Sequence, residues 1–404
     1  MEDEHLLIIG GSYDQEPLVR KAKQLNYKTI VIDQDVLSPG YKTADIKKNI
    51  STKDVDGAIE IAKEFNIKGV VTNASESAVK TVAKVSQALS LPGIPVDVAQ
   101  RVTDKELMKK AFETNGIPTA SYRIVETCED ALLAAEYLAF PCIIKPVDGA
   151  GSRGVLRIDS KDEVKNAFCY SIGYSKKKRC IIEQFIAGIE LSADAFSYGG
   201  KTEILAISDK EKIGDGRNNV AMNIVYPARF SEMEIQTAKK LIRKTIHAVG
   251  INEGPSHTEI IRRAENDFMV VETAARGGGF YTFSEIVPLA CGVDTMEQLI
   301  HWAVGKPVKI MPLYSKGVVL KFMTAEPGRV VKLSGLKALK EMRGVIAAGF
   351  FIKTGDILNK LEKDGDRAGY MIICANSSEE AVQISERASC AICIETKPIA
   401  EKEG

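Results

Sequence analysis

Short apolar runs and amphipathic helical stripes alternate along the first hundred residues. Residues 6–9, 29–32 and 69–72 are apolar runs, and glycine or polar residues follow each of them. Between the second and third runs, apolar residues in the segment 55–65 recur every three or four positions, which is the spacing of one helix face. Strand–helix alternation of this kind predicts a parallel sheet with helices on both faces, in a domain that we expect to end near residue 97.

The segment that follows is predicted to form a helix with clear start and stop signals. Thr103 and Glu106 have the spacing of a capping box, and Gly116 ends the helical pattern. Lys105 then lies in the first turn, where the helix dipole normally disfavours a cation. Two interpretations stay open: a solvated surface lysine, or a lysine that helps the first amide groups to bind phosphate.

Residues 141–155, PCIIKPVDGAGSRGV, combine a short apolar run with Lys145 and three glycines spaced as G-x-G-x-x-G. A dinucleotide-binding fingerprint must run into a helix, but residues 155–158 alternate like a second strand. The pattern therefore favours a glycine-rich hairpin. It is either an ordinary hairpin with a mobile tip or a flap that covers phosphate groups with backbone amides.

Residues 180–186 are predicted to form another strand, with Glu183 near its end and Glu190 a few residues further on. An edge strand carrying surface polar groups would show this pattern. A strand whose backbone reads an adenine base, with Glu190 accepting hydrogen bonds from ribose hydroxyls, would show it as well.

A hairpin later in the chain opposes two carboxylates. If the hairpin is symmetric about the turn at 264–267, Arg263 faces Phe268 and Glu259 faces Glu272. Opposed carboxylates repel each other and destabilise a hairpin, unless a hard cation takes their oxygen atoms. The pattern therefore favours a magnesium site at this pair, although another turn register would separate the two glutamates.

Arg276 and the glycines Gly277 and Gly278 follow that hairpin directly. A fixed cation and a closely approaching backbone suit an anionic substrate or transition state. Arg217, in the polar segment KIGDGRNN, is a candidate contact from a substrate loop, with a plain surface loop as the equal alternative.

Composition narrows the function classes. Lys+Arg and Asp+Glu both number 54, so the chain lacks the basic charge of a nucleic-acid-binding protein. No apolar run has the length of a membrane span, and the charged start does not resemble a signal peptide. Eight dispersed cysteines suit reduced thiols in a cytoplasmic enzyme. Cys390 and Cys393 form a C-x-x-C in a predicted terminal strand, where core packing is favoured over a redox or metal role.

Gly10 and Asp33 follow the first two apolar runs and leave an NAD-binding oxidoreductase open as an alternative. The third glycine of the dinucleotide fingerprint is missing from GGSYDQ, so this is the minority interpretation.

Five stretches, in this order, resemble the ATP-grasp superfamily: TDKELMKKAFETNGIPT, PCIIKPVDGAGSRGV, IIEQFIAGIELSADAF, HTEI and VETAARGGG. The resemblance implies an α/β and α+β chain with the ATP-grasp fold. It implies a Rossmann-like pre-ATP-grasp domain (1–97), an ATP-grasp domain (98–312) and a C-terminal β-rich domain (313–404). Within the second domain it implies a lid at about 126–200 and a central catalytic part at about 200–312.

The resemblance also assigns roles to residues. ATP phosphates would be bound by Lys105, Lys145, Gly149, Gly151, Ser152 and Gly154. The adenine would be lined by Glu183, Gln184, Phe185 and Ile186, with the ribose on Glu190. Mg²⁺, or Mn²⁺ in its place, would be bound by Glu259 and Glu272. Arg276 and Lys145 would be catalytic, and the substrates would meet Arg276, Gly277, Gly278 and Arg217.

One position departs from the family pattern: Ala274 stands where many members have an asparagine as a third metal ligand. The AARGGG segment resembles the carboxylate–amine ligase branch, which includes L-amino acid ligases. The implied reaction is amide formation through an acyl-phosphate, from a small carboxylate or amino acid and an amine, with no nucleic-acid or membrane partner and a homodimer left open. The alternatives are a carboxylase or carbamoyl-phosphate synthetase-like enzyme acting on bicarbonate, and an inactive binding module.

Overall fold

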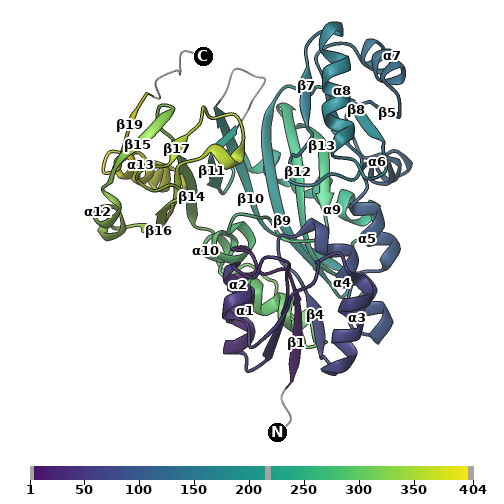
Figure 1. Ribbon diagram of the computed structural model, residues 1–404, viewed down its shortest axis with the longest axis vertical. Helices are drawn as coiled ribbons and strands as arrows, with labels where there is room; N and C mark the ends of the chain where they lie inside the picture. The colour runs from purple at the N-terminus through teal and green to yellow at the C-terminus, as the bar shows by residue number, and fades with distance from the viewer. Residues whose placement is uncertain (1–3, 214–219, 399–404) are drawn as a thin grey trace.

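The computed structural model describes residues 4–213 and 220–398. In this part of the chain the strands form four sheets, and Figure 1 shows their arrangement. No helix in the described ranges is both long enough and apolar enough to cross a membrane.

The N-terminal part is a parallel four-stranded sheet in the order β3-β2-β1-β4, as the apolar pattern predicted. Its two faces bury alternate residues of β1: Leu6 and Ile8 pack on one side, and Leu7 and Ile9 on the other. The strands are β1 (His5–Ile9), β2 (Lys28–Ile32), β3 (Ile46–Lys48) and β4 (Gly69–Val71), and the helices are α1 (Glu16–Gln24), α2 (Pro39–Thr43), α3 (Val55–Glu64) and α4 (Glu76–Leu89).

Two helices, α5 (Val96–Val102) and α6 (Lys105–Thr114), lead to the next unit. Lys105 is the first residue of α6, as predicted, but the predicted cap at Thr103 is wrong. Asp104 caps the helix instead, because its side chain accepts a hydrogen bond from the Leu107 amide at 3.1 Å. The Thr103 hydroxyl is occupied on α5, where it donates to the Ala99 carbonyl at 2.7 Å.

An antiparallel sheet in the order β5-β8-β6-β7 carries two helices on one side, and we call this unit, residues 122–184, the lid. The predicted glycine-rich hairpin is confirmed, because β6 pairs antiparallel with β7. The elements are β5 (Tyr122–Val125), α7 (Cys128–Leu138), β6 (Cys142–Pro146), β7 (Leu156–Ile158), the 3₁₀ turn η1 (Lys161–Glu163), α8 (Val164–Gly173) and β8 (Cys180–Gln184).

The largest sheet has eight strands in the order β13-β12-β9-β10-β11-β14-β18-β16. Helix α9 starts with a capping box between Ser231 and Glu234 and packs its apolar stripe on the sheet. The elements up to the end of this part are β9 (Ile189–Tyr198), β10 (Lys201–Ile213), β11 (Val220–Tyr226), α9 (Glu232–Ala248), β12 (Gly254–Ala264), β13 (Asp267–Ala274), the π-helix η2 (Thr282–Ile286), α10 (Val287–Cys291) and α11 (Thr295–Ala303).

The hairpin of β12 and β13 confirms the central sequence prediction, because Glu259 is paired with Glu272. The predicted pairing of Arg263 with Phe268 is wrong, since Phe268 pairs with Arg262. Irregularities at two places in the ladder shift the register and then restore it, so the error near the turn does not reach the glutamates.

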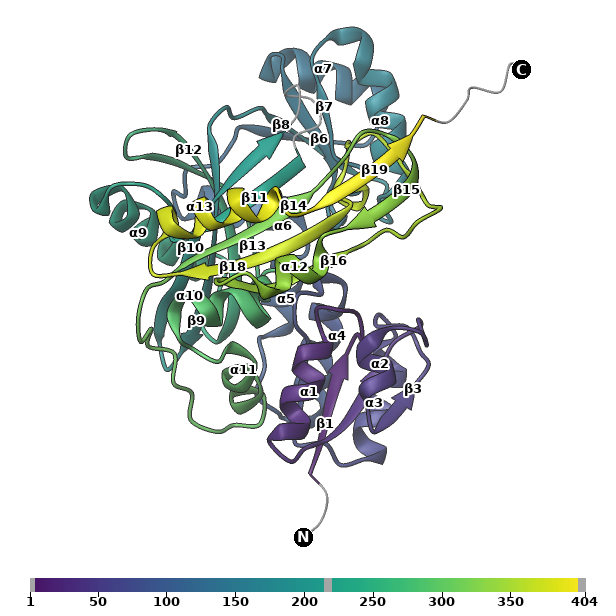
Figure 2. The same cartoon turned by 90° about the vertical axis from the view of Figure 1, so that its left-hand side faces the viewer.

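The C-terminal strands continue the same large sheet, because β14 pairs with β11. A second, three-stranded sheet in the order β17-β15-β19 completes this region, and Figure 2 shows α13 lying along the extended sheet. The elements are β14 (Gly317–Met323), β15 (Gly328–Ser334), α12 (Leu336–Glu341), β16 (Val345–Phe350), β17 (Ile357–Leu358), the 3₁₀ turn η3 (Asp364–Asp366), β18 (Gly369–Ala375), α13 (Ser378–Ser389) and β19 (Cys393–Lys397).

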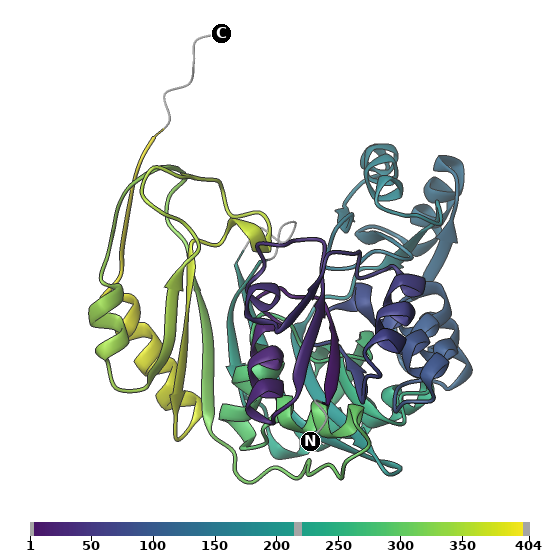
Figure 3. The same ribbon diagram turned by 60° about the horizontal axis from the view of Figure 1, so that its bottom comes forward.

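All eight cysteines are free thiols. Of the predicted C-x-x-C, only Cys393 lies in the terminal strand, since Cys390 is the exposed residue that follows α13 as its cap. Figure 3 shows the C-terminal strands and the lid on opposite sides of the N-terminal sheet.

Candidate active site

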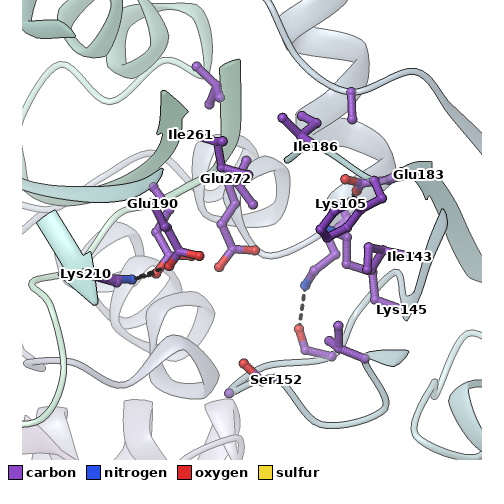
Figure 4. Close-up of a pocket in the computed structure, with 18 of the residues that line it drawn as sticks. Lys105, Ile143, Lys145, Ser152, Glu183, Ile186, Glu190, Lys210, Ile261 and Glu272 are labelled. Carbon is purple, nitrogen blue, oxygen red and sulfur yellow. Dashed lines mark hydrogen bonds and ion pairs between the residues drawn. The ribbon is translucent and has the colours of Figure 1, made fainter. Parts of the chain in front are cut away.

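A cavity of about 510 Å³ lies between the lid and the large sheet and collects most of the predicted site residues (Figure 4). The predicted residues that line it are Lys105, Lys145, Gly149, Gly151, Ser152, Glu183, Gln184, Phe185, Ile186, Glu190, Glu259 and Glu272. Gly154, Arg276, Gly277 and Gly278 do not line it. Arg217 falls outside the described residues.

A buried group of two lysines and one glutamate forms the lid side of the cavity. The Glu183 carboxylate on β8 lies 2.9 Å from Lys145 Nζ on β6 and 3.3 Å from Lys109 Nζ on α6. Burial alone would raise the pKa of Glu183, but the two lysines outweigh burial and lower it. Burial also disfavours charge on Lys145, and Glu183 and Glu272 reverse that effect and raise its pKa. Lys145 is therefore held as a cation in a fixed position.

Lys109 is a member of this group that sequence reasoning missed. Its side chain is only 2% exposed, and burial lowers its pKa more than Glu183 restores it. Its sequence signal is a charged residue between Met108 and Phe112, both buried, on the inner face of α6.

The opposite side of the cavity is acidic and is held by one lysine. Lys210 Nζ on β10 lies 2.7 Å from a Glu190 oxygen and 2.6 Å from a Glu259 oxygen. Burial would raise the pKa of both glutamates, but Lys210 lowers both. Sequence reasoning missed Lys210, although it faces Glu190 across the β9–β10 hairpin. The Glu190 carboxylate, which is predicted to accept hydrogen bonds from ribose hydroxyls, already accepts hydrogen bonds from Lys210 and Lys212.

Glu272 differs from the other carboxylates in the cavity. Its side chain has no hydrogen bond or ion pair to any described residue, and it points between the Glu190–Lys210 pair and the two lysines Lys105 and Lys145 (Figure 4). With Glu259 opposite, it offers oxygen ligands of the kind that Mg²⁺ takes. No group of three or more His, Cys, Asp or Glu side chains suited to a metal gathers in the described ranges. A magnesium ion here would have two protein carboxylates, which fits an ion that is also bound by phosphate oxygens and water.

The glycine-rich loop faces these carboxylates from the lid. Lys105 Nζ donates to the Gly149 carbonyl at 2.8 Å, so the first turn of α6 is tied to the loop. Gly151 has a positive φ of 64°, and no atom would meet an added Cβ within 4 Å, so its backbone is open to a ligand. Gly154 has a different role, because its φ is 77° and an added Cβ would meet Tyr174 at 3.1 Å.

Arg276 reaches the cavity through an acidic neighbour. Arg276 Nη2 lies 3.6 Å from Glu76, which is the first residue of α4 and lines the cavity. Burial raises the pKa of Glu76, and the nearby Glu272 raises it further. Sequence reasoning missed Glu76, which comes directly after β4 and a short polar turn.

The glycines after Arg276 have packing reasons of their own. A Cβ on Gly277 would lie 2.2 Å from the Phe283 ring, and one on Gly278 would lie 2.9 Å from His257 Nδ1. The Gly278 amide donates to Asp194 at 2.7 Å. Both glycines are buried, so the close approach of backbone that the sequence suggested is made by protein groups.

His257 and Asp194 form a buried pair below this segment, and sequence reasoning did not identify it. His257 Nδ1 lies 3.1 Å from Asp194 Oδ1, and His257 Nε2 lies 3.9 Å from Glu259. Burial would lower the pKa of His257, but Asp194 and then Glu259 raise it to about 9. The pair links the carboxylates of the cavity to the segment that carries Arg276.

Comparisons with known proteins identify related segments and a shared fold. Residues 138–283 match the family model of the ATP-grasp domain, and residues 321–397 match that of L-amino acid ligase C-terminal domain 2. The chain is 24% identical over 390 residues to the uncharacterized protein y4rH of Sinorhizobium fredii. The aligned region covers 94% of this chain and 79% of that protein. It is 21% identical over 322 residues to the L-arginine-specific L-amino acid ligase of Bacillus subtilis, covering 77% of this chain and 76% of that protein.

The same fold occurs in a solved structure. The crystal structure of an L-amino acid ligase from Bacillus licheniformis superposes with a TM-score of 0.84 at 22% identity, over 98% of this chain and 100% of that chain. The matched segments, the fold and the cavity of lysines, glycines and opposed carboxylates identify residues 138–283 as an ATP-grasp domain and support an ADP-forming ligase of the carboxylate–amine branch.

Proposed function

We propose that this enzyme joins a small carboxylate, with amino acids as the favoured class, to an amine through an acyl-phosphate, and releases ADP and phosphate. The observation that carries the proposal is one cavity in which Lys105, Lys145 and the glycine loop face Glu259 and Glu272. Cations and free amides on one wall suit phosphate oxygens, and two carboxylates on the other suit a metal ion bound to the same phosphates.

The lid side would bind the triphosphate. Lys145 is already held by Glu183, and Lys105 is 2.8 Å from the loop carbonyl that it would leave to meet a phosphate. Backbone groups at the end of β8, at Gln184–Ile186, would face the adenine, with Ile143 and Ile261 as apolar walls. Phosphoryl transfer depends mainly on such positioning and on charge neutralisation.

Glu259 and Glu272 would hold Mg²⁺, which when bound neutralises phosphate charge. The family uses ATP and Mg²⁺ in general, and the donor set fits that use. Lys210 holds the Glu259 carboxylate at 2.6 Å, so this metal ligand is positioned before any ion arrives. With Ala274 in place of a third ligand, we propose one magnesium ion bound by two carboxylates.

The bonding changes follow from the substrates. An oxygen of the substrate carboxylate attacks the γ-phosphorus, the bond to the ADP oxygen breaks, and an acyl-phosphate forms. The amine nitrogen then attacks the acyl carbon, the carbon–oxygen bond to phosphate breaks, and the amine loses a proton to solvent. Arg276, anchored beside Glu76, would approach the transferring phosphate from the end of β13.

The test is ADP release by the purified enzyme with Mg²⁺-ATP across a grid of carboxylates and amines, with products identified by mass. We expect ADP release that needs both partners, and a product equal to their sum minus water. ADP release that depends on bicarbonate instead would replace this proposal with the carboxylase alternative. Without ADP release for any pair, the chain would be a binding module.

The NAD-binding alternative has less support, because the turn GGSYDQ after β1 lacks the third glycine of the dinucleotide fingerprint. Cytoplasmic location and a homodimer remain predictions.

A further inference from the structure

A second cavity of about 480 Å³ adjoins the candidate active site. It lies between the glycine-rich loop of the lid and helices α3 and α4 of the N-terminal part. Glu76, Gly149, Ala150 and Arg153 line both cavities. A ligand in the second cavity would therefore lie next to the glycine loop and to the Glu76–Arg276 pair.

Cations outnumber acids around this second cavity. The cationic side chains are Lys53, Lys80, Lys84, Arg153 and Lys176, and the acidic ones are Glu76 and Asp148. Both acids are engaged elsewhere: Glu76 lies 3.6 Å from Arg276, and Asp148 accepts from the Ser175 hydroxyl at 2.7 Å and from the Lys176 amide at 3.1 Å. In the described part of the chain, none of the four lysine ammonium groups has a hydrogen bond or an ion pair.

The surroundings of two of these lysines, Lys53 and Lys80, disfavour a positive charge in the absence of a ligand. Burial lowers the pKa of Lys53, and Lys176 and Arg153 lower it further. Burial and then Lys177 lower the pKa of Lys80 by more than Asp104, Asp148 and Glu76 raise it. Helix α4 also begins at the cavity wall with Glu76 and Ser77, so its positive end adds to the field there. An anion would relieve each of these effects.

We propose that this cavity binds an anionic group, phosphate or carboxylate, on the substrate that is activated by ATP, so that the substrate carries a second negative charge besides its reacting carboxylate. This inference rests on the proposed function and names its substrate class. The triphosphate has its own cations, Lys105 and Lys145, in the first cavity. The volume of the second cavity lies within the usual range for small-molecule sites. It is larger than one phosphate ion needs.

The experiment compares matched carboxylate substrates that differ in one anionic group: phosphoserine with serine, and glutamate with glutamine, each with the same amine. We expect kcat/KM for ADP release to favour the charged member of a pair by at least about tenfold, since charge-assisted hydrogen bonds to lysines are strong. In the Lys80→Ala/Lys84→Ala variant this preference should fall by about tenfold or more through KM, while KM for ATP is unchanged. The control variant is Lys63→Ala/Lys68→Ala, which removes two exposed charges of the same N-terminal part that do not line the cavity.

Besides an equal reaction of charged and neutral substrates, three results would overturn the inference. One is a rise in KM for ATP with every substrate in the Lys80/Lys84 variant, which would assign the cavity to ATP phosphates. Another is an equal response of the test and control variants. The third comes from calorimetric titration: inorganic phosphate that binds as tightly as phosphoserine would make the site one for free anions.

The titration also separates this inference from the proposed function. If no pair of substrates releases ADP, the ligase proposal fails, yet phosphoserine should still bind the wild type more tightly than serine does, and bind the Lys80→Ala/Lys84→Ala variant more weakly. If ADP is released but charged and neutral substrates react alike, the ligase proposal stands and the anion site falls.

Discussion

Two adjoining cavities share the glycine loop but differ in whether their lysines form ion pairs. In the candidate active site, Lys145 is paired with Glu183, and Lys210 with Glu190 and Glu259. In the second cavity, Lys53, Lys80, Lys84 and Lys176 have no such partner among the described residues. Paired lysines have fixed positions before a ligand arrives, which suits catalysis by preorganised charge. Lysines without an ion pair can bind a negatively charged group of a ligand, which suits substrate selection.

The largest expected effect tests Glu272, the carboxylate of the first cavity that has no partner among the described residues. Glu272→Gln should reduce ADP formation by at least about a thousandfold, because it removes a charged ligand from the proposed metal site. Since Glu272 has no partner among the described residues, thermal unfolding should not change. Glu265→Gln, in the exposed turn of the same hairpin, is the matched control. Turnover like that of the wild type in Glu272→Gln would refute the metal assignment.

The next effect tests the paired lysines of the lid. Glu183→Gln leaves Lys109 and Lys145 buried without their counter-charge, so it should lower the free energy of unfolding by about 3–5 kcal/mol. The side chains of these three residues are at most 9% exposed, which keeps solvent from screening the loss. Urea denaturation measures it. Glu126→Gln, which removes an ion pair of Arg179 from a side chain that is 61% exposed, should cost less than about 1 kcal/mol. Equal losses in the two variants would contradict the contrast.

A smaller effect concerns the stability of the fold at low pH. The two lysines hold the pKa of folded Glu183 below its ordinary value of 4.5, so this carboxylate stabilises the fold above that pH and loses its contribution as the pH falls below it. Urea midpoints in a pH series that crosses 4.5 should therefore fall more steeply for the wild type than for Glu183→Gln. Parallel curves would show that Glu183 does not carry this linkage.

The smallest expected effect concerns the unpaired lysines. Without ligand, Lys80→Ala/Lys84→Ala should leave the unfolding temperature unchanged or slightly raised, because it relieves repulsion and breaks no ion pair among the described residues. Phosphoserine should then raise the unfolding temperature of the wild type more than that of the variant. A large fall in the unfolding temperature of the ligand-free variant would mean that these lysines serve the fold.

Local sequence patterns predicted the elements that depend on neighbouring residues. The alternation of strands and helices predicted the parallel sheet, and the turn after β12 predicted the pairing of Glu259 with Glu272. The sequence pattern assigned the N-cap of α6 to Thr103, but Asp104 occupies that position. Both residue types cap helices, and the backbone conformation of the folded chain decides which of them does so.

The rest depends on segments that are far apart in the chain. Lys210 reaches Glu259 from 49 residues away, and Arg276 meets Glu76 only when the segment after β13 and the start of α4 come together. The second cavity combines α4 with the lid loop, and neither Lys80 nor Lys176 carries a motif. Charges of this kind look like solvated surface residues until the fold brings them together.

The most direct test of the central claim follows one oxygen atom. A carboxylate substrate found in the ADP-release grid is labelled with ¹⁸O at both carboxyl oxygens and turned over with the amine and Mg²⁺-ATP. If the carboxylate attacks the γ-phosphate and the amine then displaces phosphate, each released phosphate carries one oxygen from the carboxylate, and mass spectrometry will show one ¹⁸O per phosphate. Phosphate without label, formed together with the amide, would contradict an acyl-phosphate and with it the account of this site.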